Sequence, residues 1–272
     1  MSELQNNRIV RAFDEARQAG AKQLLPFLTA GYPDIETTGA LLGEIERRGA
    51  HVCELGIPFS DPVADGPTIQ ASYVDALAGG ATVDGIFQTV REYRRGGGEL
   101  GLISMVSYSI VFRRGVEAYV KAAAEAGLDG LIIPDLSLEE AGRVEQVARQ
   151  AGLCNIMLIS PNTPPDRRSR IAEHSSGFIY FMSVVGITGE RDKLPDETIA
   201  AVAALREQTD TPICVGFGIS TPEMVETVCD VADGAIVGSA IVKRITAAKD
   251  KPRETLVEEV GGFVGELLSP LQ

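Results

Sequence analysis

Short apolar segments of strand-like composition recur eight times along this 272-residue chain, and stretches with helical periodicity separate them. The eight strand candidates are residues 23–29, 51–55, 100–106, 130–133, 155–159, 178–182, 213–215 and 235–237. Several helical stretches end in a glycine before the next strand, as in QAGA and EAGL, where a left-handed C-cap is expected. Strands that alternate with helices pair in parallel and bury both faces of their sheet.

Eight such units in about 250 residues match the size of a (β/α)8 barrel. An open doubly wound sheet is the alternative, but the even number of units and the lack of an early GxGxxG turn disfavour it. Residues 8–20 predict an additional amphipathic helix under the barrel floor, and residues 254–268 predict a closing helix. Because no linker interrupts the chain, we expect an α/β (β/α)8 TIM barrel with an extra N-terminal helix, forming a single domain over residues 1–272.

The formal net charge of −13 disfavours nucleic acid and anionic membrane surfaces as partners. No apolar run reaches membrane-spanning length and the start has no signal-peptide core, so we expect a cytoplasmic protein. Four scattered cysteines predict buried thiols rather than disulfides or a zinc site. With only two histidines, a Ser-His-Asp triad or a multi-histidine metal site is improbable, so acid–base chemistry falls to Asp, Glu, Tyr or Lys.

A carboxylate interrupts the second strand candidate near its end. Glu54 shares a face of that strand with Val52, because side chains alternate along a strand. In a barrel, the ends of the strands carry the catalytic groups. Apolar surroundings would favour the protonated form of Glu54, which could then serve first as general acid and afterwards as general base. An ion pair with a Lys or Arg on a neighbouring strand is the structural alternative, although basic residues are rare at the other strand ends.

Two further carboxylates lie in the Pro- and Gly-rich loop that follows, IPFSDPVADGP. Asp61 occupies a good turn position, so an Asx-turn or cap is the favoured interpretation. Asp65 lies just before a predicted helix, where a helix N-cap is one interpretation. The other is a partnership with Glu54, in which Glu54 moves protons and Asp65 accepts an N–H of the substrate.

Three late turns place glycine where a strand meets a helix: SVVGITGE, VGFGISTPE and VGSAIVK. They contribute Gly186, Gly189, Gly216, Gly218, Gly238 and Ser239. Barrels often bind phosphate on the loops after strands seven and eight. Glycine permits a close backbone approach and a serine adds a hydroxyl donor, so we predict a phosphate site in preference to plain tight turns.

Two further segments have both a structural and a functional interpretation. Residues 186–194 (GITGERDKL) are either a lid that closes over the ligand or an ordinary surface loop. Tyr180 shares a strand face with Phe178 and Met182, so it either packs in the core or lines the ligand cavity.

The motifs PFLTAGYPD, ELGIPFSDPVADGPTIQ, LIIPDL, SVVGITG, VGFGIS and GSAIVK, in this order, resemble the tryptophan synthase alpha-subunit family over nearly the whole chain. The resemblance implies a (β/α)8 barrel, and a lyase that cleaves indole-3-glycerol phosphate to indole and glyceraldehyde 3-phosphate by a retro-aldol reaction without a cofactor. It also implies a tryptophan synthase beta subunit as partner, in an alpha-beta-beta-alpha assembly.

Matched residue by residue, the resemblance implies Glu54 as the acid–base group, Asp65 as the carboxylate that meets the indole nitrogen, and Tyr180 as the active-site tyrosine. It implies that the phosphate loops contain Gly189, Gly218, Gly238 and Ser239. Gly186 and Thr188 match the lid, in which the threonine orients the catalytic Asp. Phe27 and Met105 correspond to apolar residues around the indole ring.

The chain departs from the family pattern in loops that in the family face the beta subunit. The loop that begins at Ser107 and ends at Val111 has Ser109 in place of Asn and Ile110 in place of Pro, and Ser137 replaces another proline. A free-standing lyase, and a weakly active subunit that regulates a PLP-dependent beta subunit, are therefore alternatives. A third is another phosphate-binding barrel, such as an isomerase of histidine or tryptophan biosynthesis, although the SDP…ADGPTIQ motif argues against it.

Overall fold

The computed structural model describes residues 4–62, 65–183, 196–216 and 218–272. The strands in these ranges are β1 (Gln23–Thr29), β2 (Val52–Gly56), β3 (Gly101–Met105), β4 (Gly130–Ile132), β5 (Cys154–Ile156), β6 (Leu158–Ile159), β7 (Ile179–Met182), β8 (Ile213–Gly216) and β9 (Gly234–Val237). The helices are α1 (Arg8–Ala19), α2 (Ile35–Arg47), α3 (Pro67–Ala78), α4 (Val83–Arg95), α5 (Tyr108–Arg114), α6 (Val116–Ala126), α7 (Leu138–Gln150), α8 (Pro165–Glu173), α9 (Asp196–Arg206), α10 (Pro222–Cys229), α11 (Ser239–Ala248), α12 (Arg253–Leu268) and the 3₁₀ turn η1 (Ser269–Leu271).

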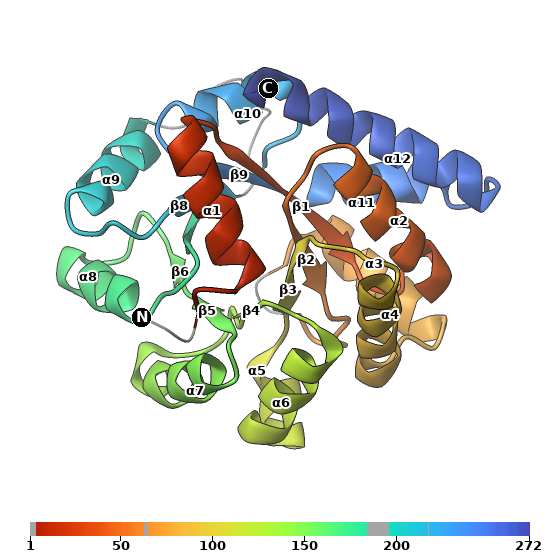
Figure 1. Cartoon of the computed structure of the whole chain (residues 1–272), viewed down its shortest axis with the longest axis horizontal. Coiled ribbons are helices and arrows are strands. Elements are labelled where there is room, and N and C mark those ends of the chain that lie inside the picture. Colours follow the sequence, from red (N-terminus) through yellow and green to blue (C-terminus); the bar gives the residue numbers. More distant parts are fainter. Residues whose placement is uncertain (1–3, 63–64, 184–195, 217) are drawn as a thin grey trace.

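All strand pairs are parallel, in the order β5-β4-β3-β2-β1-β9-β8-β7-β6. The first strand pairs with the last, and helices surround the sheet, so the predicted (β/α)8 barrel is confirmed (Figure 1). The predicted fifth strand, residues 155–159, is split at Met157: β5 pairs with β4, and β6 pairs with β7. The break therefore lies where the two edges of the sheet meet.

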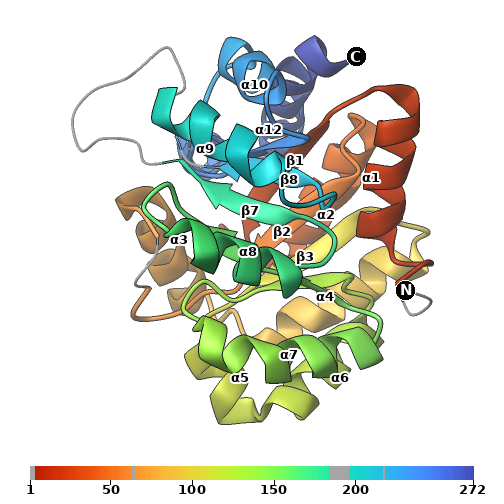
Figure 2. The ribbon, with the colours of Figure 1, turned by 90° about the vertical axis from the view of Figure 1, so that its left-hand side faces the viewer.

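The extra N-terminal helix closes the floor of the barrel, as predicted (Figures 1 and 2). Ile9, Ala12 and Phe13 of α1 are buried against an inner cluster of strand side chains, and the rings of Phe13 and Phe178 lie 5.6 Å apart. Gly20 ends α1 with φ = 66°, a left-handed conformation that favours glycine. Burial of the apolar face of α1 fixes which end of the barrel stays open.

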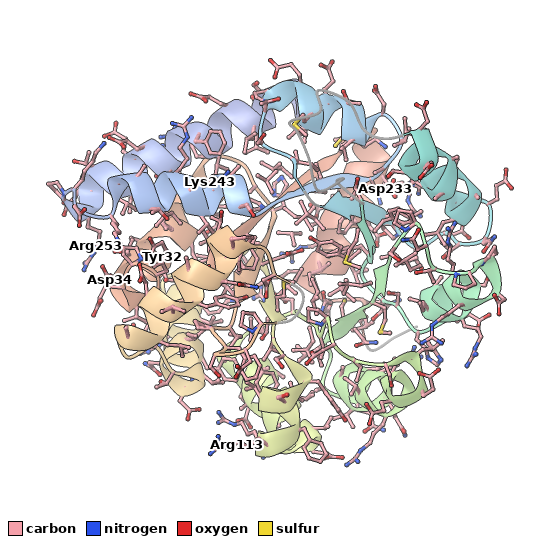
Figure 3. The ribbon with its side chains drawn as sticks, turned by 180° about the vertical axis from the view of Figure 1, so that it is seen from behind. Tyr32, Asp34, Arg113, Asp233, Lys243 and Arg253 are labelled. Carbon is pink, nitrogen blue, oxygen red and sulfur yellow. The ribbon has the colours of Figure 1, made fainter. Side chains whose placement is uncertain are left out.

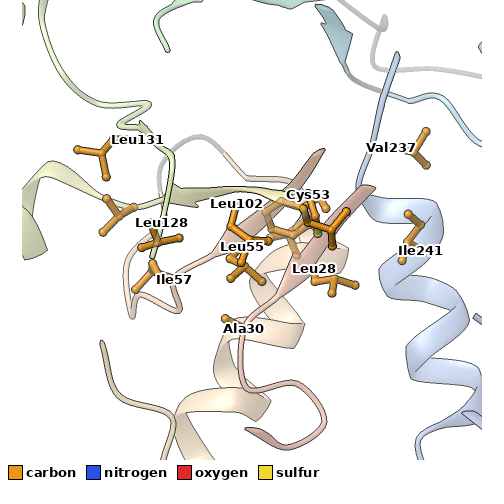
Figure 4. Close-up of a cluster of buried hydrophobic side chains, with 14 of the residues drawn as sticks. Leu28, Ala30, Cys53, Leu55, Ile57, Leu102, Leu128, Leu131, Val237 and Ile241 are labelled. Atoms are coloured by element: carbon orange, nitrogen blue, oxygen red, sulfur yellow. The ribbon is translucent and has the colours of Figure 1, made fainter. Parts of the chain in front are cut away.

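A second, larger apolar layer lies between the sheet and the outer helices. Figure 4 shows part of it, including Leu28, Leu55 and Leu102 on the strands and Ile241 on α11. All four cysteines are buried and free, as predicted. None of the helices among the described residues is both long and apolar enough to cross a membrane.

Asp129 centres a polar network at the floor of the barrel. Its side chain is 5% exposed and accepts from Arg94 at 2.7 Å, Arg8 at 3.2 Å and the backbone N–H of Leu102 at 2.9 Å. Its backbone carbonyl accepts from the Asn7 side chain at 2.7 Å. This network attaches the start of α1 to β3 and to the segment before β4, at the end of the barrel opposite the carboxyl ends of the strands.

The C-terminal helices are joined to the first strand–helix loop. Tyr32 donates a hydrogen bond to Thr246 of α11 at 3.0 Å, and Arg253 lies 3.7 Å from Asp34 (Figure 3). These contacts join the loop after β1 to α11 and α12.

The segment after β3 differs from the sequence-based expectation of a loop, because Tyr108–Arg114 form α5. Ser107 caps this helix by accepting from the backbone N–H of Ser109 at 3.3 Å. The backbone N–H of Ile110 donates to the Ser107 carbonyl at 3.1 Å. A proline at position 110 would lack this donor, so the departure from the family pattern adds a hydrogen bond to the first turn of α5.

Candidate active site

Glu54 lies near the carboxyl end of β2 with its side chain directed toward the open end of the barrel. In the register of the sheet it stands between Phe27 of β1 and Ile103 of β3. The residue is 1% exposed, and its Oε1 atom has no hydrogen-bond partner among the described residues. Burial raises its pKa to about 8, because an apolar environment disfavours the charged form.

The structural alternative for Glu54, an ion pair with a basic residue, is wrong for the part of the chain that the structure describes, where no such pair forms. A buried carboxyl with an oxygen that has no hydrogen-bond partner among the described residues costs stability, which is a common sign of a functional group.

Asp65 lies beside the same cavity, at the end of the loop that follows β2. Burial raises its pKa to about 6, a smaller shift than that of Glu54. The side chain of Gln70 donates to the Asp65 carbonyl at 2.8 Å, which holds the end of the loop against the first turn of α3. The N-cap of α3 is Gly66, without a side-chain cap, so the N-cap interpretation of Asp65 is wrong.

One cavity of about 280 Å³ contains both carboxylates, close to the lower limit of about 300 Å³ for ligand pockets. It is lined by Phe27, Glu54, Asp65, Gly66, Pro67, Ile69, Met105, Leu158, Tyr180, Met182, Gly218, Ile219, Ile236, Gly238 and Ser239. The lining is mainly apolar, with the carboxylates, the phenol and the serine as its polar side chains. Such a site suits a flat apolar ring that carries a few polar groups.

Tyr180 lines this cavity from β7 and is 9% exposed. Burial and the nearby charges of Glu54 and Asp65 raise the pKa of its phenol, which therefore stays a neutral hydrogen-bond donor. Phe27 of β1 lines the same cavity, with its ring against Gly56 of β2 and its Cβ atom near Gly238.

The turns after β8 and β9 meet at one wall of the cavity. Gly218, Gly238 and Ser239 all line it, and Ser239 is the first residue of α11. Free backbone N–H groups at a helix N-terminus bind anions well. Gly218 has φ = 79°, so a side chain at this position would strain the turn.

The predicted lid residues Gly186 and Thr188, and the phosphate-loop residue Gly189, lie outside the described residues. Asp61 is exposed and accepts from the Ser60 hydroxyl at 2.7 Å, away from the residues that line the cavity.

Sequence reasoning missed Tyr73, whose phenol lies close enough to both carboxylates for their charges to raise its pKa. Tyr73 is 3% exposed and lies on α3, four residues after the cavity residue Ile69. This helical spacing places both side chains on one face of α3, and that was the signal available in the sequence.

The loops after β3 and β4 are bound to each other beside this cavity. Asp135 accepts from the Ser107 hydroxyl at 2.9 Å and from the backbone N–H of Tyr108 at 2.7 Å. Ser137 stands at the N-cap position of α7 without a side-chain cap bond. On the outer side, Phe112 of α5 is 71% exposed.

Comparison with known proteins decides the family. The family model described as tryptophan synthase alpha chain matches residues 13–267. The chain belongs to the tryptophan synthase alpha chain family. A tryptophan synthase alpha chain from Rhodopirellula baltica is 45% identical over 264 residues, covering 94% of this chain and 95% of the relative. One from Prochlorococcus marinus is 45% identical over 258 residues, covering 94% of this chain and 92% of the relative.

Solved structures agree with this membership of the tryptophan synthase alpha chain family. A tryptophan synthase alpha chain from Legionella pneumophila superposes with a TM-score of 0.87 at 34% identity, covering 97% of each chain. A chain of tryptophan synthase from M. tuberculosis, in an aminoacrylate-bound form, gives 0.86 at 29% identity and covers 98% of this chain and 100% of that one. The activity is accordingly that of the family, a carbon–carbon lyase of tryptophan biosynthesis that cleaves indole-3-glycerol phosphate. The interpretation as another phosphate-binding barrel is wrong.

Proposed function

We propose that Glu54 and Asp65 carry the retro-aldol cleavage of indole-3-glycerol phosphate to indole and glyceraldehyde 3-phosphate. The observation that supports this most strongly is the buried carboxyl of Glu54, which lines the same cavity as Asp65 and whose Oε1 atom has no hydrogen-bond partner among the described residues. Their different environments favour different protonation states at neutral pH. A pair of acids whose pKa values are separated in this way fits one acid role and one anion role.

In the proposed reaction, protonated Glu54 donates its proton to C3 of the indole ring. Positive charge then develops on the indole nitrogen, and the Asp65 carboxylate stabilises it by accepting the N–H. The Glu54 carboxylate takes the proton of the 3′-hydroxyl as the bond from C3 to the side chain breaks and the aldehyde forms. Glu54 ends the cycle protonated, so the protons balance and no cofactor is needed.

Different residues of the cavity bind the indole ring and the phosphate group of the substrate. We infer that Phe27 and Met105 contact the indole ring, and that Tyr180 orients the substrate with its neutral phenol. Gly218, Gly238 and Ser239 receive the phosphate, with the N-terminus of α11 supplying backbone donors. Local donors of this kind are needed because the net charge of −13 repels an anionic substrate at long range.

The assay that tests this proposal is indole release from indole-3-glycerol phosphate. Glu54→Gln should lower kcat by at least about 10²–10⁴-fold with a small change in substrate affinity, since one group serves two proton transfers. Asp65→Asn should also be severely impaired. A parental rate in Glu54→Gln would remove Glu54 from the mechanism, and a parental rate in Asp65→Asn would reduce Asp65 to a loop residue.

We further propose a tryptophan synthase beta subunit as partner, in an alpha-beta-beta-alpha assembly. The exposed Phe112 and the joined loops after β3 and β4 form a surface beside the open end of the barrel, near the cavity. Titration of a beta subunit into the indole-release assay tests this. Full turnover without the partner would support the free-standing lyase, whereas strong activation by it would support the regulated subunit.

Two sequence-based expectations stay predictions. A single domain over residues 1–272 is supported by α1 and α12, which both contact the barrel strands. The other is the cytoplasmic location.

A further inference from the structure

The hydroxyl groups of two tyrosines lie at the open end of the barrel, each next to a glycine that is the last residue of a strand. A Cβ atom on Gly216 of β8 would collide with the hydroxyl of Tyr180, and a Cβ atom on Gly56 of β2 would lie 2.7 Å from the hydroxyl of Tyr73. Since real Cβ atoms do not approach so closely, these strand ends admit the phenols only because the residues are glycines.

The position of Tyr73 is fixed by the packing of α3 on β1. Its neighbour Ser72 shares a buried hydrogen bond of 2.6 Å with Thr29 of β1 and donates to the Ile69 carbonyl at 2.7 Å. Gln70 holds the Asp65 carbonyl against the same helix at 2.8 Å. Tyr73 and the backbone of Asp65 are therefore both held to α3.

Tyr73 and Asp65 also line a common recess next to the main cavity, together with Met105. The Tyr73 side chain is buried, and among the described residues its hydroxyl forms no hydrogen bond that would compete with one to Asp65. The charges of Asp65 and Glu54 raise the pKa of Tyr73 further above the level set by burial, which agrees with a phenol close to both acids.

We propose that the Tyr73 hydroxyl is a positioning group that hydrogen-bonds the Asp65 carboxylate when the substrate is bound, orienting it toward the indole N–H. This inference rests on the proposed function, because it assigns Tyr73 a role through Asp65. A phenol suits this role, because it donates one hydrogen bond to an anion and stays neutral at the pH of the reaction. The ring of Tyr73 is held by packing, so little side-chain entropy is lost when the bond forms.

The test is a double-mutant cycle of Tyr73→Phe and Asp65→Asn in the indole-release assay. Tyr73→Phe keeps the ring and should lower kcat/KM about tenfold or more, the usual effect of losing a hydrogen bond to a charged group. In the Asp65→Asn background the same change should lower kcat/KM less than about threefold, because the partner anion is gone. Equal losses in both backgrounds would overturn the proposal, as would a parental rate in Tyr73→Phe.

The pH profile gives a readout that a purely structural role would not change. Because the proposed bond forms in the substrate complex, loss of this donor should shift the acid limb of kcat, which reports that complex, toward higher pH in Tyr73→Phe. An unshifted limb would overturn the proposal. The control is Tyr119→Phe, which removes a buried phenol bonded to Ser104 at 2.7 Å outside the cavity and should leave the profile unchanged.

The outcomes for Tyr73 and for the proposed function can be told apart. If the parental chain releases no indole, the proposed function itself fails. If the parental chain releases indole, and Asp65→Asn is impaired while Tyr73→Phe is normal, only the role of Tyr73 fails.

Discussion

The phenol of Tyr180 occupies the space that a side chain on Gly216 would need. An added Cβ atom would meet the hydroxyl of Tyr180, its Cζ atom at 2.7 Å and its Cε1 atom at 2.9 Å. The two residues lie on the neighbouring strands β7 and β8, where Met182 is the register partner of Gly216. The glycine thus determines how far the tyrosine extends over the end of the adjacent strand.

Gly216→Ala should therefore displace Tyr180 from the cavity wall. We expect a loss of about 1–3 kcal/mol in unfolding free energy, as for other overpacked sites, and a fall in kcat/KM of at least about tenfold. Urea unfolding and the indole-release assay measure the two effects. The control is Gly43→Ala on α2, where a Cβ atom would meet nothing within 4 Å, so stability should stay equal or rise. Unchanged activity in Gly216→Ala would show that the position of Tyr180 does not matter.

The two carboxylates predict a bell-shaped pH dependence of kcat/KM. The reaction needs ionised Asp65, with a pKa of about 6, and protonated Glu54, with a pKa of about 8. Activity should fall below the first value because Asp65 becomes neutral, and above the second because Glu54 loses the proton that it donates. A rate profile between pH values of about 5 and 9 measures both limbs. If the acid limb persists in Asp65→Asn, another group is responsible for it.

The same burial of Glu54 has a cost in stability that depends on pH. Its pKa is raised from 4.5 to about 8, so the folded chain binds more protons than the unfolded chain between these values. The stability of the parental chain should therefore decrease as pH rises through this window. Glu54→Gln removes this pH-dependent cost. The difference in unfolding free energy between Glu54→Gln and the parent should therefore shift in favour of the variant by about 2–5 kcal/mol between about pH 5 and pH 9, since one pKa unit corresponds to about 1.4 kcal/mol. Chemical unfolding at both pH values checks it; a constant difference would contradict the raised pKa.

The floor network predicts a loss of stability without a loss of catalysis. Asp129→Ala leaves Arg94, which is largely buried, without its partner, and should cost about 3–5 kcal/mol in unfolding free energy. The control Asp75→Ala removes a half-exposed pair with Lys249 and should cost less than about 1 kcal/mol. Turnover per folded molecule should be unchanged in both, measured below the unfolding transition. A large fall in turnover in Asp129→Ala would mean that the floor and the cavity are coupled.

The sequence predicted the barrel and the placement of Glu54 well, because both follow from periodicity. Alternation along β2 put Glu54 and Val52 on one face, and the structure confirms that this face is the inner one. The break of the fifth strand at Met157 could not be predicted, since it depends on how the two edges of the sheet meet.

Local capping and packing explain the other differences. Helix α5 depends on one serine cap, a signal too short to separate from a loop. The hydroxyl of Tyr73 reaches the site only through the space over Gly56, which requires the packing of α3 on the barrel. The roles of the site residues stay predictions until the variants are measured.

The split strand at Met157 has a mechanical consequence. A barrel whose hydrogen-bonded ladder runs unbroken around its circumference resists any change in its diameter, but here the ladder has a seam between β5 and β6. Leu158, the first residue after the seam, lines the cavity. Small opening motions should therefore concentrate along this seam, and amide hydrogen exchange should be fastest there among the strands. The cavity wall at the seam would then open and close locally, while β1 and β2, which carry Phe27 and Glu54, stay fixed.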